Sequence, residues 1–368
     1  MKMKIVYITS YDPFTYRRPI FAKKALPSIQ IFDYSTIYKT KLKTLGKIFY
    51  RTNRCLAKVE RSIYGYDYIL SKSFQNNVNK LALNGIDSED VITLNNFLAS
   101  KRIWKDSRVI IDLMDVLNTQ NLEEADGVIF WSKAFMNIIN SRLKIKKCIY
   151  VPHGIDLKSF DPMKFGNSIW FRKMYSLEDY FILTYSGGIW RVRGEDLQGV
   201  DNMLRAFSKI SKKIKRVVLI LQTFNMDVNA LRLIKEMGIK DKIIIGQLPF
   251  NDFKRLSLFS ATDVFIAPTS RNPIAYYAER MKYFQYMTAK KPIVAEESPG
   301  SKNVFGDSAY YIQLGDCESM VDGILDLYHN EDLRNYFGEK ARERVVEKFE
   351  WSKLIPIYRD FITSIVNS

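Results

Sequence analysis

Two adjacent glycines, Gly187 and Gly188, follow a short apolar stretch and precede two arginines, Arg191 and Arg193. Glycines let the backbone approach a phosphate closely, and a helix that begins after such a loop offers N–H groups and a favourable dipole. The arginines would then neutralise a diphosphate. Residues 184–207 therefore predict an anion-binding loop, and an ordinary turn with solvated arginines is the alternative.

A second group of polar side chains lies in residues 267–297. Glu279, Lys282 and Gln285 are spaced three apart, so on a helix they share one face. That face suits a ligand that carries both a ribose and a phosphate. The alternative is a helix whose polar side faces water, which is the commoner arrangement.

Carboxylates follow two apolar stretches of the first half. Asp112 and Asp115 come at the end of a buried stretch, where a carboxylate would face the edge of a parallel sheet and act as a general base. Asp115 is the first choice, and a helix cap or a turn is the alternative role. Asp12, Arg17 and Arg18 follow the first stretch and suit an anionic ligand.

A repeating pattern predicts the elements that position these residues. Short apolar runs recur at 4–8, 68–70, 91–94, 109–111, 128–131 and 148–151, and again at 181–185, 216–221, 242–245, 264–267, 292–295 and 310–312. Such runs between amphipathic stretches are typical of parallel strands buried on both faces. Two consecutive series predict an α/β chain of two doubly wound, Rossmann-like domains.

The boundary between the two series is marked by Pro152, Gly154 and Pro162. These residues predict an interdomain linker over 151–162, so the domains cover 1–150 and 163–349. The helical spacing of the last segment breaks near residue 349. Residues 350–368 therefore predict a terminal helix that returns to the amino-terminal domain.

Composition restricts the partners and the compartment. The chain has 368 residues, 47% of them hydrophobic, which is enough for two cores, and its net charge of +16 predicts an anionic partner. The three cysteines lack disulfide or metal spacing, and the two histidines have no metal-ligand neighbours. No apolar run is long enough to span a bilayer. We therefore expect a cytoplasmic protein without a metal site.

Residues 39–63 predict a basic amphipathic helix. Apolar residues recur on one side, and the other carries Lys39, Lys43, Lys47, Arg51, Arg54, Lys58 and Arg61. Such a helix either enters the headgroup layer of an anionic membrane or presents a solvated face. The segment by itself favours peripheral membrane association and a solvated face equally, and each cation near an anionic leaflet would contribute about 1 kcal/mol to the former.

Four stretches between residues 151 and 295 resemble motifs of the group 1 glycosyltransferases. They are VPHGIDLKSF, QGVDNMLRAF, DKIIIGQLPFNDFKRLSLFSATDVFIAPTS and MKYFQYMTAKKPIVA. The resemblance covers most of residues 147–360. It implies the GT-B architecture, in which two Rossmann-like domains face a central cleft. The second domain would bind a nucleotide-diphosphate sugar, and the first would bind the acceptor with Asp12, Arg17 and Arg18.

The resemblance also implies roles in the donor site. Gly187 and Gly188 correspond to the phosphate loop of the family, Lys282 to a lysine of one branch, and Gln285 to a glutamate that binds ribose hydroxyls. No metal and no cofactor are implied, because basic side chains stabilise the leaving diphosphate and the nucleotide sugar is a substrate.

The chain departs from the family at two places. Gln198 stands at the usual lysine position, for which Arg193 is a displaced candidate. The family pair of glutamates would require residues 277 and 285, where this chain has Tyr277 and Gln285. Glu279 is a candidate substitute, and the stereochemistry stays open.

The predicted function is therefore a metal-independent glycosyltransferase of the hexosyl type. Its acceptor would be a lipid-linked glycan at the cytoplasmic face of the membrane, as part of polysaccharide or glycan biosynthesis. Two alternatives stay open: a non-catalytic or epimerase-like GT-B protein, and a basic nucleic-acid-binding protein. The second has no recognisable nucleic-acid-binding motif in its favour, so no nucleic-acid partner is expected.

Overall fold

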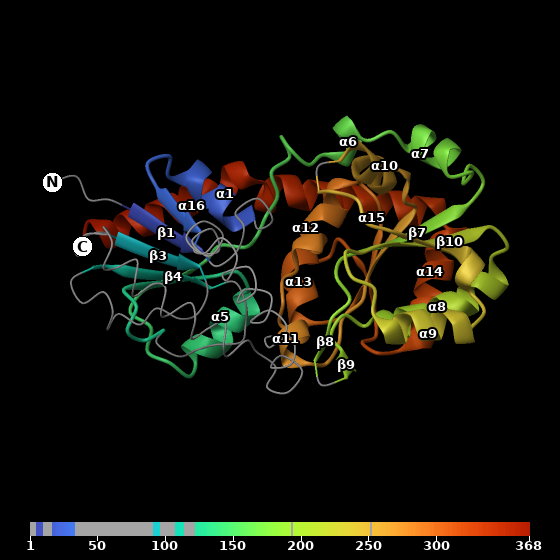
Figure 1. Ribbon diagram of the computed structural model, residues 1–368, viewed down its shortest axis with the longest axis horizontal. Helices are drawn as coiled ribbons and strands as arrows, with labels where there is room; N and C mark the ends of the chain where they lie inside the picture. The colour runs from blue at the N-terminus through green and yellow to red at the C-terminus, as the bar shows by residue number, and fades with distance from the viewer. Residues whose placement is uncertain are drawn as a thin grey trace, which may run out of the picture. The chain divides into compact units, whose positions relative to one another are not determined.

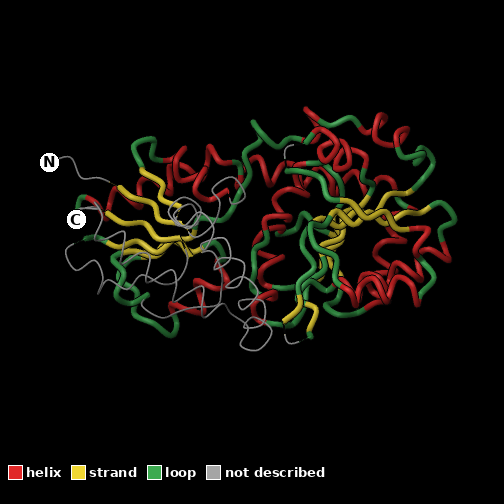
Figure 2. The backbone as a smooth tube through the Cα atoms, viewed as in Figure 1, coloured by secondary structure: helices red, strands yellow, loops and turns green. Residues whose placement is uncertain are grey.

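The structure is a computed structural model, and it describes residues 5–9, 17–33, 91–95, 107–113, 122–192, 194–250 and 252–368. The chain divides into two compact units (Figures 1 and 2). Unit 1 comprises residues 1–152, 192–194 and 352–368, and unit 2 comprises residues 153–191 and 195–351. Each unit contains one parallel sheet of six strands.

The sheet of unit 1 has the strand order β2-β1-β3-β4-β5-β6, with every neighbouring pair parallel. Its strands are β1 (Ile5–Thr9), β2 (Gln30–Asp33), β3 (Val91–Asn95), β4 (Val109–Leu113), β5 (Gly127–Phe130) and β6 (Cys148–Tyr150). All five residues of β4 and all four of β5 are buried. The predicted strand at 68–70 lies outside the described residues, and β2 was not predicted.

Among the described residues of unit 1, three helices pack on this sheet: α1 (Arg17–Ala25), α5 (Lys133–Asn140) and α16 (Trp351–Val366). Figure 1 shows α1 and α16 on one face and α5 on the other. The rings of Phe21 in α1 and Tyr358 in α16 meet edge to face, with centroids 5.3 Å apart. The last helix thus completes the core of unit 1, although it is separated from that unit in sequence by the whole of unit 2.

The sheet of unit 2 has the strand order β11-β10-β7-β12-β13-β14, again parallel throughout. Its strands are β7 (Phe181–Ser186), β10 (Val217–Gln222), β11 (Ile243–Gly246), β12 (Val264–Ala267), β13 (Ile293–Glu296) and β14 (Tyr310–Ile312). Numbered within the unit, this is the 3-2-1-4-5-6 order of a doubly wound nucleotide-binding sheet. The short strands β8 (Arg191–Val192) and β9 (Glu195–Asp196) form a separate ribbon.

Helices cover both faces of the second sheet (Figure 1). The helices α8 (Val200–Lys213), α9 (Val228–Glu236) and α14 (Cys317–His329) share a core with Leu183, Leu219 and Ile266. The other core joins Ile182, Ile220 and Phe265 to α10 (Phe253–Ala261), α12 (Met281–Thr288), α13 (Pro299–Phe305) and α15 (Glu331–Arg344). Neighbouring strand residues enter opposite cores because side chains alternate along a strand.

Shorter elements connect these helices and strands. They are α6 (Pro162–Phe165), α7 (Ser168–Met174), η2 (Lys240–Lys242), α11 (Pro273–Tyr276) and η3 (Val345–Phe349). The segment 151–162, predicted as an interdomain linker, is for the most part packed into unit 2. Ile155 and Phe160 are fully buried in the core of unit 2, and Ile155 pairs with Glu350 in an isolated parallel bridge. The chain thus joins unit 2 directly after Pro152.

The structure bears on one of the membrane-related predictions, the absence of a spanning helix. Within the described ranges, no helix is both long enough and apolar enough to cross a bilayer. The predicted basic helix at 39–63 lies outside these ranges.

Candidate functional site

The glycine pair lies where the second sheet reverses its winding direction. The strand β7 ends at Ser186, Gly187 and Gly188 follow it, and β12 is its neighbour on the side where the strand order turns back. Ligands of doubly wound sheets bind at this edge. Gly187 has a φ of 154°, and a Cβ atom there would lie 3.3 Å from Lys282 Cδ. Glycine thus permits a close approach of Lys282.

Lys282 brings a buried positive charge to this loop from the first turn of α12. The residue is 7% exposed, and its Nζ lies 4.0 Å from the centroid of the Tyr185 ring. The Nζ donates a hydrogen bond to Gln198 Oε1 at 3.3 Å. Burial, and next the charge of Arg280, hold the pKa of Lys282 well below its ordinary value. Its surroundings therefore disfavour the charged form of Lys282 beside the glycines unless an anion lies close to it.

Arg280 is a second cation at the same place. Its Nη1 donates to Gln198 Oε1 at 2.6 Å and to the Pro268 carbonyl at 3.1 Å. Its Nη2 donates to the Leu197 carbonyl at 3.0 Å and to Thr269 Oγ1 at 2.9 Å. All four acceptors are neutral. Arg280 and Lys282 thus share one amide oxygen, and neither has an ion-pair partner among the described carboxylates.

A third cation, Arg255, reaches the end of β7 from α10. Its Nη2 donates to Gln285 Oε1 at 2.9 Å and to Ser186 Oγ at 3.2 Å. Burial lowers the pKa of Arg255 to about 10. Arg255, Arg280 and Lys282 form what we call the cation cluster. Because the charges of Arg280 and buried Lys282 repel each other without a counter-ion among the described carboxylates, the cluster favours an anionic ligand.

Glu279, Lys282 and Gln285 were predicted to share one face of a helix, but Glu279 does not lie on that helix. The helix α11 ends at Tyr276 and α12 begins at Met281, so Glu279 lies in the segment between them. It is 4% exposed, and its Oε1 accepts a hydrogen bond from Asn303 Nδ2 at 3.3 Å. Lys282 and Gln285 do share a face of α12, but that face is buried. The alternative of a water-facing stripe is therefore wrong.

Arg191 binds two carboxylates of the chain. Its Nη1 and Nη2 bond both carboxylate oxygens of Asp201, at 3.0 and 2.6 Å, and its Nε bonds Asp227 Oδ2 at 2.6 Å. Asp201 belongs to the first turn of α8, and Asp227 caps α9. The charge of Arg191 is thus compensated within the fold, which favours a structural role over the predicted role in diphosphate binding. Arg193 lies outside the described residues.

The amino terminus of α8 is also occupied. The carboxylate of Asp196 accepts hydrogen bonds from the backbone N–H groups of Gln198 and Asp201, both at 2.8 Å. Gly199 has a φ of 73°, and a Cβ atom there would lie 2.3 Å from the Thr269 carbonyl oxygen. This terminus therefore binds the chain's own carboxylate, and the anion site consists of the cation cluster and the glycine loop.

Two residues predicted for the other site form a structural pair in unit 1. Asp112 is fully buried, and its carboxylate accepts from Arg18 Nε at 2.9 Å. It also accepts from Trp131 Nε1 at 2.7 Å, Tyr358 Oη at 3.2 Å and Tyr7 Oη at 3.3 Å. This geometry favours a structural role for Asp112 and Arg18 over the predicted catalytic and ligand roles, since each charge is compensated by the other.

The remaining predicted residues of unit 1 are less defined. Arg17 is the first residue of α1 and is half-buried. Asp12 and Asp115 lie outside the described residues. Both aspartates therefore stay predictions from the sequence alone.

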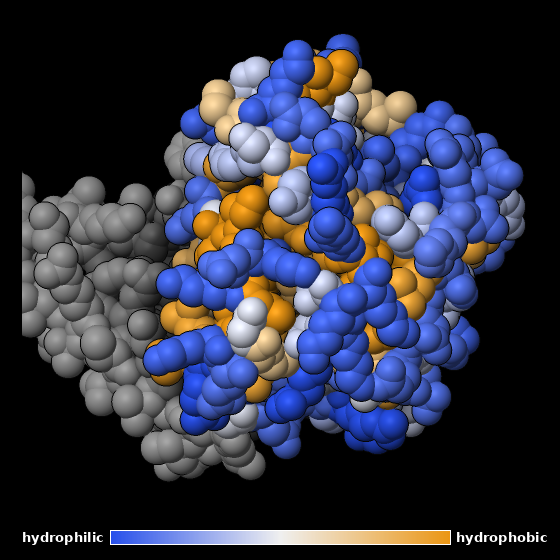
Figure 3. Space-filling view, turned by 90° about the vertical axis from the view of Figure 1, so that its right-hand side faces the viewer, coloured by the Kyte–Doolittle hydropathy of each residue, from blue (hydrophilic) through white to orange (hydrophobic). Residues whose placement is uncertain are grey.

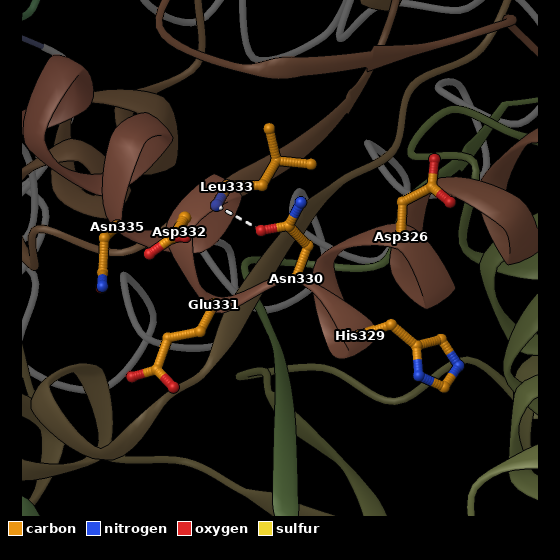
Figure 4. Close-up of a pocket in the computed structure, with 7 residues that line it drawn as sticks. All are labelled: Asp326, His329, Asn330, Glu331, Asp332, Leu333 and Asn335. Atoms are coloured by element: carbon orange, nitrogen blue, oxygen red, sulfur yellow. Dashed lines mark hydrogen bonds between the residues drawn. The ribbon is translucent and has the colours of Figure 1, made fainter.

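Two surface hollows of unit 2 lie away from the cation cluster. One is lined by Asp326, His329, Asn330, Glu331, Asp332, Leu333 and Asn335, where α14 ends and α15 begins (Figure 4). The other is lined in part by Asp179, Arg216 and Asp263, which precede β7, β10 and β12. Because a crossover helix runs antiparallel to the strand before it, both hollows lie at the amino ends of the strands.

The first hollow is lined by carboxylates, whereas the candidate site is lined by cations. Figure 4 shows its three carboxylates pointing in different directions, and Asn330 is engaged as the cap of α15, accepting from Leu333 N at 2.9 Å. No three His, Cys, Asp or Glu side chains of the described ranges are placed to hold a metal ion. An acidic surface repels a diphosphate, so the cation cluster is the better candidate site.

Comparisons with known proteins concern the family and the fold. Residues 178–344 match the model of the family described as glycosyl transferases group 1. An uncharacterized glycosyltransferase of Methanocaldococcus jannaschii is 24% identical over 250 residues, which is 67% of this chain and 60% of that protein. The N-acetyl-alpha-D-glucosaminyl L-malate synthase of Bacillus anthracis is 23% identical over 43% of this chain and 40% of its own length. The alignments thus span less than two thirds of these relatives.

Among solved structures, Anabaena HepE in complex with UDP and glucose has a TM-score of 0.68. The match covers 98% of this chain and 100% of HepE, with 14% identical residues. Such low identity establishes the fold alone, which is that of the GT-B enzymes.

Proposed function

We propose that this chain, whose residues 178–344 match the group 1 glycosyl transferase model and whose fold is GT-B, transfers a hexosyl group from a nucleotide-diphosphate sugar. The observation that supports the proposal most is the cation cluster beside Gly187, whose members lack carboxylate partners within the described ranges. A diphosphate is the anionic group that such donors carry. HepE was solved with UDP and with UDP-glucose, so these are the first ligands to test.

The proposed mechanism uses the cluster to stabilise the leaving group. When the bond between sugar and phosphate breaks, negative charge develops on the departing diphosphate. Preorganised cations aimed at that position lower the barrier, because they need no rearrangement as the charge appears. Lys282 and Arg280 take this role, and no metal ion is required for it.

The proposal predicts a specific effect of Lys282→Ala. Charge-assisted hydrogen bonds are worth roughly 1.5–3 kcal/mol, so UDP affinity should fall about 10- to 100-fold. Uridine affinity should change little, because the nucleoside has no diphosphate. The matched control is Lys302→Ala, which removes an exposed lysine paired with Glu297 in the same unit. Isothermal titration of both ligands measures the effect, and equal affinities for UDP and uridine in the wild type would contradict it.

We also propose that the acceptor is a lipid-linked glycan and that the protein binds an anionic membrane. Besides the predicted helix at 39–63, one described surface supports this. The helices α6, α7 and α10 pack together without a single Asp or Glu among their residues. Exposed apolar side chains alternate there with cations: Met163, Lys164, Phe165, Ile169, Lys173, Met174, Phe253 and Lys254. We call this surface the apolar–basic face.

In Figure 3 the right-hand side of Figure 1 faces the viewer, and apolar side chains lie at its upper end. Figure 1 places α6 and α7 at this end of unit 2. Exposed apolar groups with interspersed cations are typical of surfaces that enter a headgroup layer. Two variants test this role: Ile169→Glu with Met174→Glu, and charge reversal within 39–63. Each should reduce sedimentation with anionic vesicles several-fold and leave UDP affinity unchanged. Equal binding to neutral vesicles at high salt would contradict the electrostatic part.

A further inference from the structure

Arg255 has an unusual environment for a cation. Its guanidinium carbon lies 5.1 Å from the ring centroid of Phe250, 5.7 Å from that of Phe259 and 6.0 Å from that of Phe160. The rings attract the charge, but they do not neutralise it. Within the described ranges, no carboxylate forms an ion pair with Arg255, and its Nε is buried without a hydrogen-bond partner. A half-buried guanidinium whose buried Nε is unsatisfied is costly unless a ligand completes its contacts.

The hydrogen bonds of Arg255 also fix the orientation of its neighbours. Arginine has only donors, so the atom of Gln285 that faces it must be the amide oxygen. The amide nitrogen of Gln285 is then left as the group for a ligand, and it has no partner among the described residues. Ser186 Oγ likewise accepts from Arg255, so the hydroxyl hydrogen is left to donate. All three side chains therefore present N–H or O–H groups.

We propose that Arg255, Gln285 and Ser186 form a donor-only subsite at the end of β7 that binds a fully ionised, acceptor-only group of the ligand. This group is a phosphate of the diphosphate or the carboxylate of an acidic sugar. The proposal rests on the proposed function, since Ser186 directly precedes Gly187 and Gln285 lies one helical turn after Lys282. It assigns Gln285 a role opposite to that of the glutamate at this position in the related family, which accepts hydrogen bonds from ribose hydroxyls.

The two roles predict opposite effects of Gln285→Glu. A glutamate would place a carboxylate against Arg255 and neutralise the subsite, so the affinity should fall at least tenfold for UDP if the bound group is a phosphate, or for UDP-glucuronic acid if it is a carboxylate. If Gln285 serves only to bind ribose hydroxyls, the carboxylate would be the better acceptor and UDP affinity should rise. The substitution is nearly isosteric and creates an ion pair, so the variant should keep the wild-type Tm.

The experiment titrates uridine, UMP, UDP, UDP-glucose and UDP-glucuronic acid into four proteins: wild type, Gln285→Glu, Arg255→Met and Arg255→Lys. A phosphate ligand predicts that Gln285→Glu and Arg255→Met both weaken UDP and UDP-glucose relative to uridine. A carboxylate ligand predicts weakening of UDP-glucuronic acid alone. Arg255→Lys should keep part of the affinity, because it retains the charge and loses the planar fork.

The outcomes separate the subsite from the proposed function. Wild-type binding of UDP and of UDP-glucuronic acid with unchanged or higher affinity in Gln285→Glu would overturn the subsite alone. Failure of the wild type to bind any of the nucleotides would overturn the nucleotide-sugar proposal and the subsite together. Loss of all ligands equally, uridine included, would also overturn the subsite, since it would indicate a structural defect.

Discussion

Asp112→Ala should destabilise unit 1 by about 3–5 kcal/mol, because removing one partner of a buried ion pair leaves the other charge uncompensated. Arg18 is 3% exposed and would lose its carboxylate. Trp131, Tyr7 and Tyr358 would lose an acceptor at the same time. These partners come from β1, α1, α16 and the end of β5, so the effect should spread through the whole unit.

Urea unfolding, followed by hydrogen exchange of the strand amides of each unit, measures this effect. Arg18→Met should cost less than Asp112→Ala, because Asp112 would retain three hydrogen-bond donors. The control is Asp307→Ala, whose ion pair with Lys340 at 3.3 Å is exposed, and it should leave the midpoint almost unchanged. A stable Asp112→Ala protein that had lost only its turnover would restore Asp112 as a catalytic candidate.

Asp115→Asn should lower turnover about 10²- to 10⁴-fold and leave donor affinity unchanged, because a general base typically supplies this factor. The asparagine keeps the shape of the side chain and removes its basicity. The prediction holds for an inverting enzyme, in which the base takes the proton of the attacking acceptor hydroxyl. It rests on the sequence, since residue 115 lies outside the described ranges.

The product anomer, determined by NMR beside the rate of the variant, decides this point. An inverted anomer with a slow Asp115→Asn variant supports the assignment. A fully active variant removes Asp115 as the base. A retained anomer would instead make Gln285 and Glu279, as donor-site residues, the next candidates to test.

The sequence pattern predicted the second sheet closely. The strands β12 and β14 have the predicted bounds, β7 extends one residue further, and β10, β11 and β13 are each shifted by one residue. This accuracy has a physical cause, because parallel strands covered on both faces are continuous apolar runs. The edge strand β2 was missed, since Gln30–Asp33 has polar residues at both ends and no such run.

The site was predictable only where local spacing specifies it. The glycine pair and the 282 and 285 face follow from short-range patterns. Arg255 and Arg280 gave no signal, because their importance depends on which carboxylates are absent around them. The ion pair of Arg18 gave no signal for the same reason, since its partner Asp112 is 94 residues away in sequence and comes close only when the chain is folded.

The most direct test of the nucleotide-sugar proposal is release of a nucleoside diphosphate from a panel of nucleotide sugars, with and without a polyprenyl-linked glycan and with a chelator present. We predict release from at least one donor, stimulated by the lipid acceptor, insensitive to the chelator and strongly reduced in Lys282→Ala. Absence of release and of binding for every nucleotide sugar with the folded wild-type protein would contradict the proposal, as would release that Lys282→Ala leaves unchanged.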